Sequence, residues 1–252
     1  MKVGAHTPSA HPLAEAEERG ADLVQIFLSN PQSWKKPNPR EDAEELRNSS
    51  IPVIVHAPYL INVCADNNRV RIPSRKILQD TCDAASAIDA DAVVVHGGHV
   101  TGDSPQEEGI VRWRKALDAL DTDRQVLIEN TAGGDKALAR RVEWIKRLWE
   151  EIGSDDIGFV LDTCHAWAGG EPLDGLVDRI LDATGRIDLV HANDSKDAFD
   201  SRRDRHTNLG AGEIPEDELA QVIVGAKAPV IVETPGGAEE QATDIEWVRG
   251  LE

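Results

Sequence analysis

The sequence predicts an α/β fold, a (β/α)8 TIM barrel built from eight parallel strands that alternate with helices. Eight short apolar runs rich in β-branched residues recur along the 252-residue chain, and most precede a polar loop and a helical pattern. The runs are continuous rather than alternating, as expected for parallel strands covered on both faces. A doubly wound open sheet would usually carry a glycine-rich phosphate turn after its first strand, and none is present. The runs cover residues 2–6, 23–28, 52–57, 92–97, 126–130, 157–162, 187–191 and 229–233.

Amphipathic stretches between these runs predict the helices of the barrel. Apolar side chains recur every three or four positions at residues 77–88 and 138–152, which is the spacing of one helix face. Since no linker, repeat or low-complexity tract interrupts the pattern, we expect one domain over residues 1–252. Residues typical of a first helical turn predict helix starts at Pro12, Asp42, Pro73 and Pro215.

Composition limits the classes of function. The chain has 27 lysines and arginines against 46 aspartates and glutamates, a net charge of −19, which weakly opposes nucleic-acid binding. A protein can nevertheless confine a positive field to one face. No apolar run is long enough to span a membrane, and the N-terminus lacks a signal-peptide pattern. Three cysteines without a Cys-x-x-Cys pair argue against a disulfide framework or a thiolate zinc site. We therefore expect a cytoplasmic protein, and a monomer.

Histidine or a carboxylate ends seven of the eight predicted strands. In a barrel, the C-terminal ends of the strands converge on one mouth, where the active sites of this fold lie. Buried ionisable groups are costly unless they are paired or bind a metal ion. The pattern therefore predicts a polynuclear metal site. The residues at the strand ends are His6, His56, His96, Glu129, Asp162, His191 and Glu233.

Three further residues extend the predicted metal site. His165 follows Asp162 by three residues, where the strand is expected to give way to a loop, and the loop after the seventh strand contains Asp204 and His206. Cys164 is expected to be buried in packing and not to bind metal. Ligation by imidazole and carboxylate alone suits Zn2+ or Mn2+. The nine candidate ligands, enough for three cations, are His56, His96, Glu129, Asp162, His165, His191, Asp204, His206 and Glu233.

Two predicted loops carry local positive charge. Residues 34–40, after the second strand, and residues 69–76, after the third, contain lysine and arginine but no acid. In a chain with a net charge of −19, basic loops at the predicted mouth favour a polyanionic substrate. Residues 30–34 and 59–62 add aromatic and amide side chains that suit stacking and sugar contacts.

Taken together, these motifs resemble those of the endonuclease IV family of apurinic/apyrimidinic DNA-repair endonucleases. The resemblance implies a TIM barrel with three zinc ions, Mn2+ being possible in part. It also implies hydrolysis of the phosphodiester 5′ to an abasic site in double-stranded DNA, which leaves a 3′-hydroxyl and a 5′-deoxyribose phosphate. A 3′-diesterase activity on blocked 3′ ends would accompany it. The matching segments are residues 4–6, 30–34, 56–62, 96–98, 128–133, 161–166, 191–194, 204–212 and 232–234.

The resemblance also implies roles for single residues. Glu129 or Glu233 would orient the attacking hydroxide, so both are candidate catalytic residues. Where the family typically places an arginine that fills the gap in the DNA, this chain has Gln32. The first zinc ion would bind His56, His96 and Glu129, the second Glu129, Asp162, His191 and Glu233, and the third His165, Asp204 and His206. The candidate DNA contacts are Asn30, Gln32, Trp34, Tyr59, Leu60, Asn62, Arg69, Arg71 and Arg205.

Two other functions fit parts of the pattern. A xylose-isomerase-like sugar isomerase would ring the same mouth with Glu129, Asp162, His191 and Glu233. Such an enzyme would need neither the other histidines nor the basic loops. It is therefore the alternative to the endonuclease rather than the leading hypothesis. The third hypothesis is a DNA-binding module that a metal site stabilises. A metal site that serves stability alone would, however, be closed and simpler.

Overall fold

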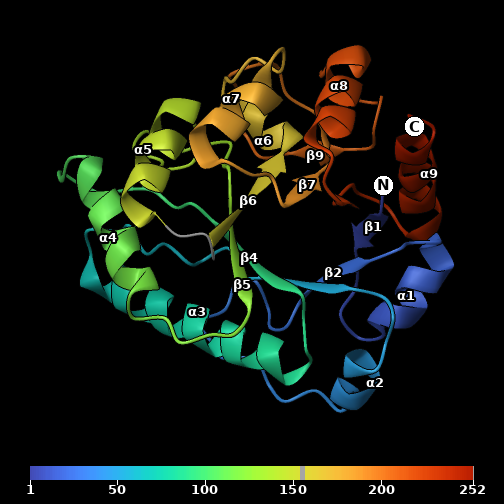
Figure 1. Cartoon of the computed structure of the whole chain (residues 1–252), viewed down its shortest axis with the longest axis horizontal. Coiled ribbons are helices and arrows are strands. Elements are labelled where there is room, and N and C mark those ends of the chain that lie inside the picture. The colour runs from blue at the N-terminus through green and yellow to red at the C-terminus, as the bar shows by residue number, and fades with distance from the viewer. Residues whose placement is uncertain (154–156, 252) are drawn as a thin grey trace.

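A computed structural model, which describes residues 1–153 and 157–251, contains a closed barrel of parallel strands (Figure 1). The predicted fold is therefore confirmed. Each strand pairs with its neighbour in the chain, and the last closes on the first through register pairs such as Gly4 with Ile231. The barrel strands are β1 (Val3–His6), β2 (Val24–Phe27), β3 (Val53–His56), β4 (Ala92–His96), β5 (Gln125–Glu129), β6 (Ile157–Asp162), β7 (Leu189–His191) and β10 (Val230–Val232).

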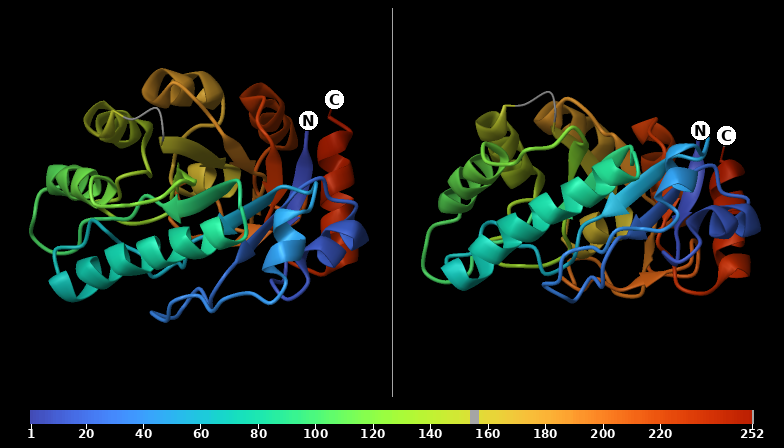
Figure 2. Two further views of the ribbon diagram at one scale, coloured as in Figure 1. Left: turned by 60° about the horizontal axis from the view of Figure 1, so that its bottom comes forward. Right: turned by 90° about the horizontal axis from the view of Figure 1, so that it is seen from below.

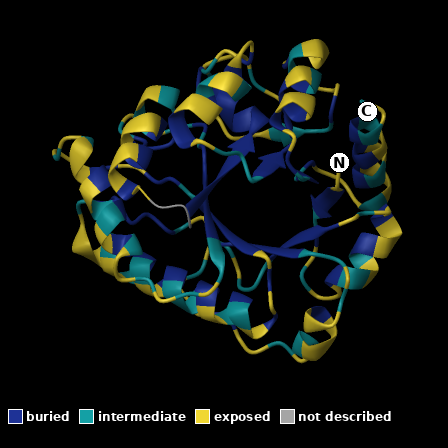
Figure 3. Cartoon of the chain, viewed as in Figure 1, coloured by how far each residue is buried: buried dark blue, intermediate teal, exposed yellow. Residues whose placement is uncertain are grey.

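Helices surround the barrel, with their polar faces outward and their apolar faces on the strands (Figures 2 and 3). A short helix, α6 (Thr163–Ala168), follows β6 at the mouth, where a small antiparallel pair also lies, formed by β8 (Asp194–Ser195) and β9 (His206–Thr207). The surrounding helices are α1 (Pro12–Arg19), α2 (Ala43–Arg47), α3 (Asn68–Ala87), α4 (Glu107–Leu117), α5 (Val142–Ile152), α7 (Leu176–Thr184), α8 (Glu216–Ala226) and α9 (Ala238–Arg249).

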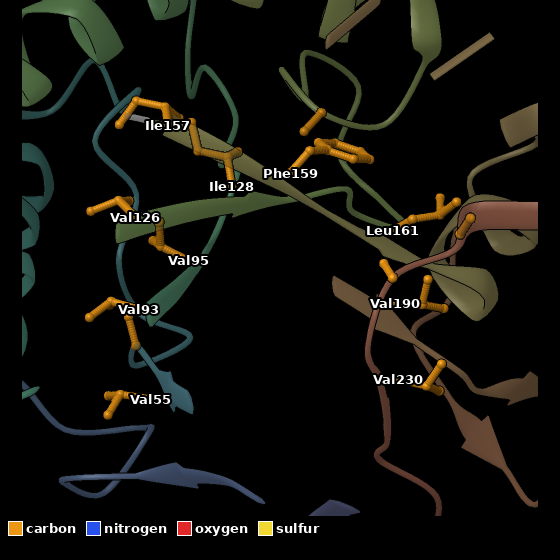
Figure 4. Packing of buried hydrophobic residues seen from close by; sticks show 14 of the residues in the cluster. Val55, Val93, Val95, Val126, Ile128, Ile157, Phe159, Leu161, Val190 and Val230 are labelled. Atoms are coloured by element: carbon orange, nitrogen blue, oxygen red, sulfur yellow. The ribbon is translucent and has the colours of Figure 1, made fainter. Parts of the chain in front are cut away.

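The strand side chains alternate between two apolar clusters, because successive residues of a strand point to opposite faces. Outward residues such as Val55, Val93 and Ile128 pack beneath the helices (Figure 4). Inward residues fill the barrel below the mouth, so the barrel is a packed core rather than a pore. The inward cluster consists of Leu23, Ile54, Ala92, Val94, Leu127, Val160, Leu189 and Ile231.

Aspartates hold the strands at the end of the barrel opposite the mouth. Asp22 accepts a hydrogen bond from the backbone N–H of Val3 at 3.0 Å, and Asp91 accepts from that of Val53 at 3.0 Å. Asp188 accepts in the same way from Phe159. Each carboxylate satisfies a strand N–H that would otherwise lack a partner. Part of the acidic surplus is therefore structural.

Three of the four predicted helix starts are confirmed, and one is wrong. Pro12 begins α1, and Asp42 and Pro215 directly precede α2 and α8. Pro73, however, lies inside α3. That helix begins earlier because the Asn67 side chain accepts the backbone N–H of residue 69 and caps it. Residues 69–76 are thus the first turns of a helix rather than a loop.

Among the helices of residues 1–153 and 157–251, none is both long enough and apolar enough to cross a bilayer.

Candidate metal centre

The mouth of the barrel gathers all nine predicted ligands. Parallel strands bring their C-terminal ends to one rim. Residues up to 177 positions apart in the sequence, such as His56 and Glu233, therefore lie at the same rim. Within each group, one ligand atom per residue lies within 4.8 Å of the others. The groups are His56, His96 and Glu129; Glu129, Asp162, His191 and Glu233; Asp162, His165 and His206; and Cys164, Asp204 and His206.

Glu129 joins the first two groups through its two carboxylate oxygens. Its Oε2 lies 3.1 Å from His56 Nε2 and 3.3 Å from His96 Nε2, while its Oε1 lies 3.1 Å from His191 Nδ1. The side chain is fully buried. Burial opposes the charged carboxylate, but His191 and His96 outweigh it and hold the pKa of Glu129 well below its ordinary value. The geometry is that of a bridging carboxylate.

Asp162 connects the second group to the third, and the local structure explains its spacing from His165. A helix, not the expected loop, follows the strand: Asp162 is the N-cap of α6, and its Oδ1 accepts the backbone N–H of His165 at 2.6 Å. A cap and the third residue of the helix it begins are three positions apart. Both side chains therefore stay at the rim, with His206 Nε2 at 3.7 Å from Asp162 Oδ2.

Asp204 faces the two histidines of the third group. Its Oδ1 lies 3.2 Å from His165 Nε2 and 3.0 Å from His206 Nε2. Burial raises the pKa of Asp204, but the two histidines outweigh it and leave that pKa below its ordinary value. Cys164 is buried, as expected, yet its sulfur also lies within reach of Asp204 and His206. Because burial raises the pKa of its thiol to about 12, Cys164 is protonated at neutral pH.

Hydrogen bonds on the far side of three histidine rings show how the residues fit divalent cations. A carbonyl oxygen can only accept, so the ring nitrogen that faces it carries the proton and the other nitrogen presents a lone pair. Metal-binding histidines are usually held in this way. The bonds join His56 Nδ1 to the Ala57 carbonyl (2.7 Å), His165 Nδ1 to the Asn130 carbonyl (2.9 Å), and His191 Nε2 to the Gln25 side-chain oxygen (2.9 Å).

His206 provides a second indication of fit. Its Nδ1 faces the Glu233 carbonyl at 3.4 Å, whereas its Nε2 is buried and has no partner of good hydrogen-bond geometry among the described residues, although Asp204 Oδ1 is 3.0 Å away. A buried polar atom without a partner is costly unless something else satisfies it. A cation shared with Asp204 would do so.

Three amide side chains of the site were not predicted from the sequence. Asn130 pairs with the backbone of Asp162, accepting its N–H at 2.7 Å and donating to its carbonyl at 2.9 Å. Asn193 donates to Asp162 Oδ2 at 2.8 Å and accepts the N–H of Glu233 at 2.9 Å. Gln25 contacts His191. Only Gln25 had a signal in the sequence, because it is a polar residue within the apolar run of residues 23–28.

Four of the predicted DNA contacts line a cavity of about 660 Å³ beside the metal cluster. Trp34, Tyr59, Leu60 and Asn62 form its walls together with His96, His165 and Asp204. The Tyr59 ring is half exposed and stacks on His96 with ring centroids 5.5 Å apart. Asn30 and Gln32 lie outside this lining on the exposed loop, where the Asn30 side chain accepts the N–H of Gln32.

The three predicted arginine contacts differ in their surroundings. Arg71 donates to the carbonyls of Ala65 and Asp66, so it ties the loop before α3 to the helix. Arg205 forms a two-point pair with Asp197, with its Nε 2.6 Å from Oδ2. Arg69 lies exposed in the first turn of α3.

The buried histidines predict how the stability of metal-free protein depends on pH. Burial lowers the pKa of His191 and of His206, but the carboxylates Glu233 and Glu129 around the first, and Asp162 beside the second, raise each to about 9. The folded state thus binds these protons more tightly than the unfolded state. The stabilisation is complete below about pH 6.5 and is lost as the pH rises through 9.

We therefore expect the free energy of unfolding of chelated protein to be smaller at pH 9.5 than at pH 6.5, by up to about 3 kcal/mol for each histidine, and its urea midpoint to be lower accordingly. Zinc-loaded protein is the control, because its ligands are already deprotonated and its midpoint should change little. An equal or higher midpoint for the chelated protein at pH 9.5 would contradict the prediction.

Comparisons with known proteins show the family of this chain. Residues 13–251 match the family model described as the xylose isomerase-like TIM barrel. The chain is 60% identical to the probable endonuclease 4 of Mycobacterium tuberculosis and 58% identical to that of Mycobacterium ulcerans, each over 99% of this chain and 98% of the relative. Endonuclease IV from Thermus thermophilus superposes with a TM-score of 0.86 at 30% identity, covering 100% of this chain and 98% of the other.

A sugar epimerase-like structure shares the fold as well. A D-tagatose 3-epimerase-like protein superposes with a TM-score of 0.81, but at 20% identity the likeness concerns the barrel alone. The relatives named endonuclease 4 are about three times as similar in sequence over the whole length. This chain belongs to the endonuclease IV family.

Proposed function

We propose that this protein hydrolyses the phosphodiester 5′ to an abasic site in double-stranded DNA, leaving a 3′-hydroxyl and a 5′-deoxyribose phosphate. The observation that carries the proposal is the continuous cluster of nine ligands, in which Glu129 joins the first group to the second and Asp162 joins the second to the third. The full-length similarity to proteins named endonuclease 4 supports it. Removal of blocking groups from 3′ ends would use the same phosphodiester chemistry.

The cluster favours a nuclease over the alternative sugar isomerase. Both would use Glu129, Asp162, His191 and Glu233. Such an isomerase has no need of the additional pair His56 and His96, nor of His165, Asp204 and His206. Three cations, in contrast, can neutralise a phosphodiester from several sides. The sugar epimerase-like neighbour shares the barrel at an identity too low to argue for its substrate.

We infer that the nine candidate ligands hold three zinc ions, with Mn2+ possible in part. The three sets are His56, His96 and Glu129; Glu129, Asp162, His191 and Glu233; and His165, Asp204 and His206. Bound there, the ions would lower the pKa of a water molecule and offset the charge of the phosphate. Glu129, buried between two groups, would fix their separation and orient the hydroxide nucleophile. Glu233, with its Oε2 3.4 Å from His191 Nδ1, is the second candidate to orient the hydroxide.

The cavity beside the cluster would receive the DNA. Tyr59 and Leu60 would wedge into the duplex at the lesion, and Trp34 and Asn62 would contact the strand beside it. Asn30, Gln32 and Arg69 would reach the backbone from the rim, and Gln32 would fill the gap less completely than an arginine. We propose that the protein acts as a monomer at the nucleoid, in the cytoplasm.

A duplex with one tetrahydrofuran abasic analogue tests the proposal. Protein with bound zinc should nick it on the 5′ side of the analogue, and sequencing-gel mobility should identify a 3′-hydroxyl end. The same duplex with an intact nucleotide is the control and should remain uncut. If metal-loaded protein leaves the analogue intact, or cuts both duplexes equally, the proposed substrate is wrong.

A further inference from the structure

Gln25 is a polar residue at the centre of β2, and its side chain points into the barrel. It is fully buried, and the register pairs it with Ile54 on one side and His6 on the other. The inward positions below it form an apolar cluster. A buried amide is costly unless its hydrogen bonds are made, so the contacts of Gln25 show what it does there.

Three hydrogen bonds place the Gln25 amide between two candidate metal ligands. Its Oε1 accepts from His191 Nε2 at 2.9 Å, and its Nε2 donates to Glu233 Oε1 at 2.6 Å and to His6 Nδ1 at 2.9 Å. The orientation of the amide is fixed by chemistry. An ionised Glu233 can only accept, so Nε2 must face it and Oε1 must face His191.

These bonds decide which atoms of the ligands face the cations. When His191 is neutral, as a ligand must be, its ring proton is on Nε2, which donates a hydrogen bond to Gln25 Oε1. The lone pair is then on Nδ1, which faces Glu129 and Glu233. Because Oε1 of Glu233 is held by Gln25, its Oε2 is the oxygen turned towards His191 Nδ1, at 3.4 Å. One amide thereby orients two ligands from different strands.

His6 acts as the support of this amide. Its Nδ1 lies 2.9 Å from Gln25 Nε2 and 3.3 Å from Glu233 Oε1, and its ring packs against Phe27 with ring centroids 4.6 Å apart. This contact accounts for the histidine at the end of β1, which belongs to none of the ligand groups found among the described residues.

We propose that Gln25 is a positioning residue of the metal centre, which sets the tautomer of His191 and the orientation of Glu233 for the cation that these two share. The inference rests on the proposed metal-dependent function. Side chains that hold metal ligands in this way typically contribute 10–100-fold to metal affinity. Gln25 should matter to the second group, while the cations of the other groups bind independently of it.

The test compares Gln25→Met with Gln241→Met. Gln241 is a buried glutamine near the mouth that also makes three hydrogen bonds, but to Arg19 and to the carbonyls of His6 and Thr234, not to a ligand side chain. Zinc per chain is measured by elemental analysis after equilibration with graded chelator. Gln25→Met should lose one of its zinc ions at about 10–100-fold higher free zinc than the parent. Gln241→Met should match the parent.

Further readouts separate positioning from general stability and from the proposed function. In excess zinc, Gln25→Met should regain most of its activity, with the residual loss in kcat rather than in KM. If Gln25→Met fails to fold, Gln25→Asn keeps the amide but is too short to span both ligands, so it should show the same loss of zinc. Equal zinc affinity in Gln25→Met and the parent overturns the inference. A parent that binds no zinc would instead overturn the proposed function.

Discussion

Replacing Glu129 with glutamine should slow abasic-site cleavage by at least about 1,000-fold while the barrel remains folded, since metal-assisted charge stabilisation is worth several kcal/mol. The two carboxylate oxygens lie 3.1–3.3 Å from histidine nitrogens of two groups. An amide of the same shape offers one oxygen in place of two and turns an N–H towards the lone pair of a histidine. It also removes a negative charge that the cations require. Single-turnover nicking of the abasic duplex measures the loss.

Glu45→Gln is the matched control for this substitution, because Glu45 is an exposed carboxylate on α2. It should cleave at the parental rate. Circular dichroism and the zinc content of Glu129→Gln show whether the loss comes from chemistry, from metal binding or from folding. Cleavage by folded Glu129→Gln within about tenfold of the parent would mean that the reaction does not depend on this bridge.

The barrel could be predicted because its signals are local. Eight continuous β-branched runs separated by helical patterns identify buried parallel strands, and the observed strands agree with the predicted runs to within about two residues at each end. The start of α3 was missed because two signals competed. Pro73 indicates a first turn, but Asn67 caps the helix six residues earlier, and the helix tolerates the proline.

The candidate ligands could be predicted because the barrel topology determines where the end of each strand lies. A residue at the C-terminal end of a barrel strand lies at the mouth, so His56 and Glu129 were expected to meet although 73 positions separate them. The helix α6 was not expected, because residues 163–168 are too few to show a helical period.

The hydrogen-bond network behind the ligands could not be predicted in the same way. The bond from Gln25 to Glu233 spans 208 positions and depends on the register that closes the barrel. Likewise, the sequence makes Arg205 a candidate DNA contact but does not show that Asp197 pairs with its guanidinium. Which partner a side chain takes depends on distances of a few ångströms between elements, and no local pattern contains them.

Removing the metal ions should abolish cleavage and lower the melting temperature by at least about 10 °C. When the concentration of free zinc is about 1,000 times the dissociation constant of a site, binding at that site adds about 4 kcal/mol to the free energy of unfolding. In a chain of this size, 1 kcal/mol corresponds to roughly 2–4 °C in melting temperature. The physical reason is the buried charge at the mouth. Without cations, the fully buried carboxylates of Glu129 and Asp162 are compensated only by protonated histidines and, for Asp162, by hydrogen bonds from Asn193 and the backbone of His165 among the described residues.

The measurement is a thermal scan of protein dialysed against chelator, beside protein dialysed against chelator already saturated with zinc. Restoring zinc should recover both the nicking activity and the melting temperature, because the apolar core and the strand register do not depend on the ions. A melting temperature unchanged within about 2 °C, in protein shown by elemental analysis to be metal-free, would mean that cations add almost nothing to folding. The histidine protons would then suffice to hold four carboxylates together at the mouth, and the case for the metal centre would rest on activity alone.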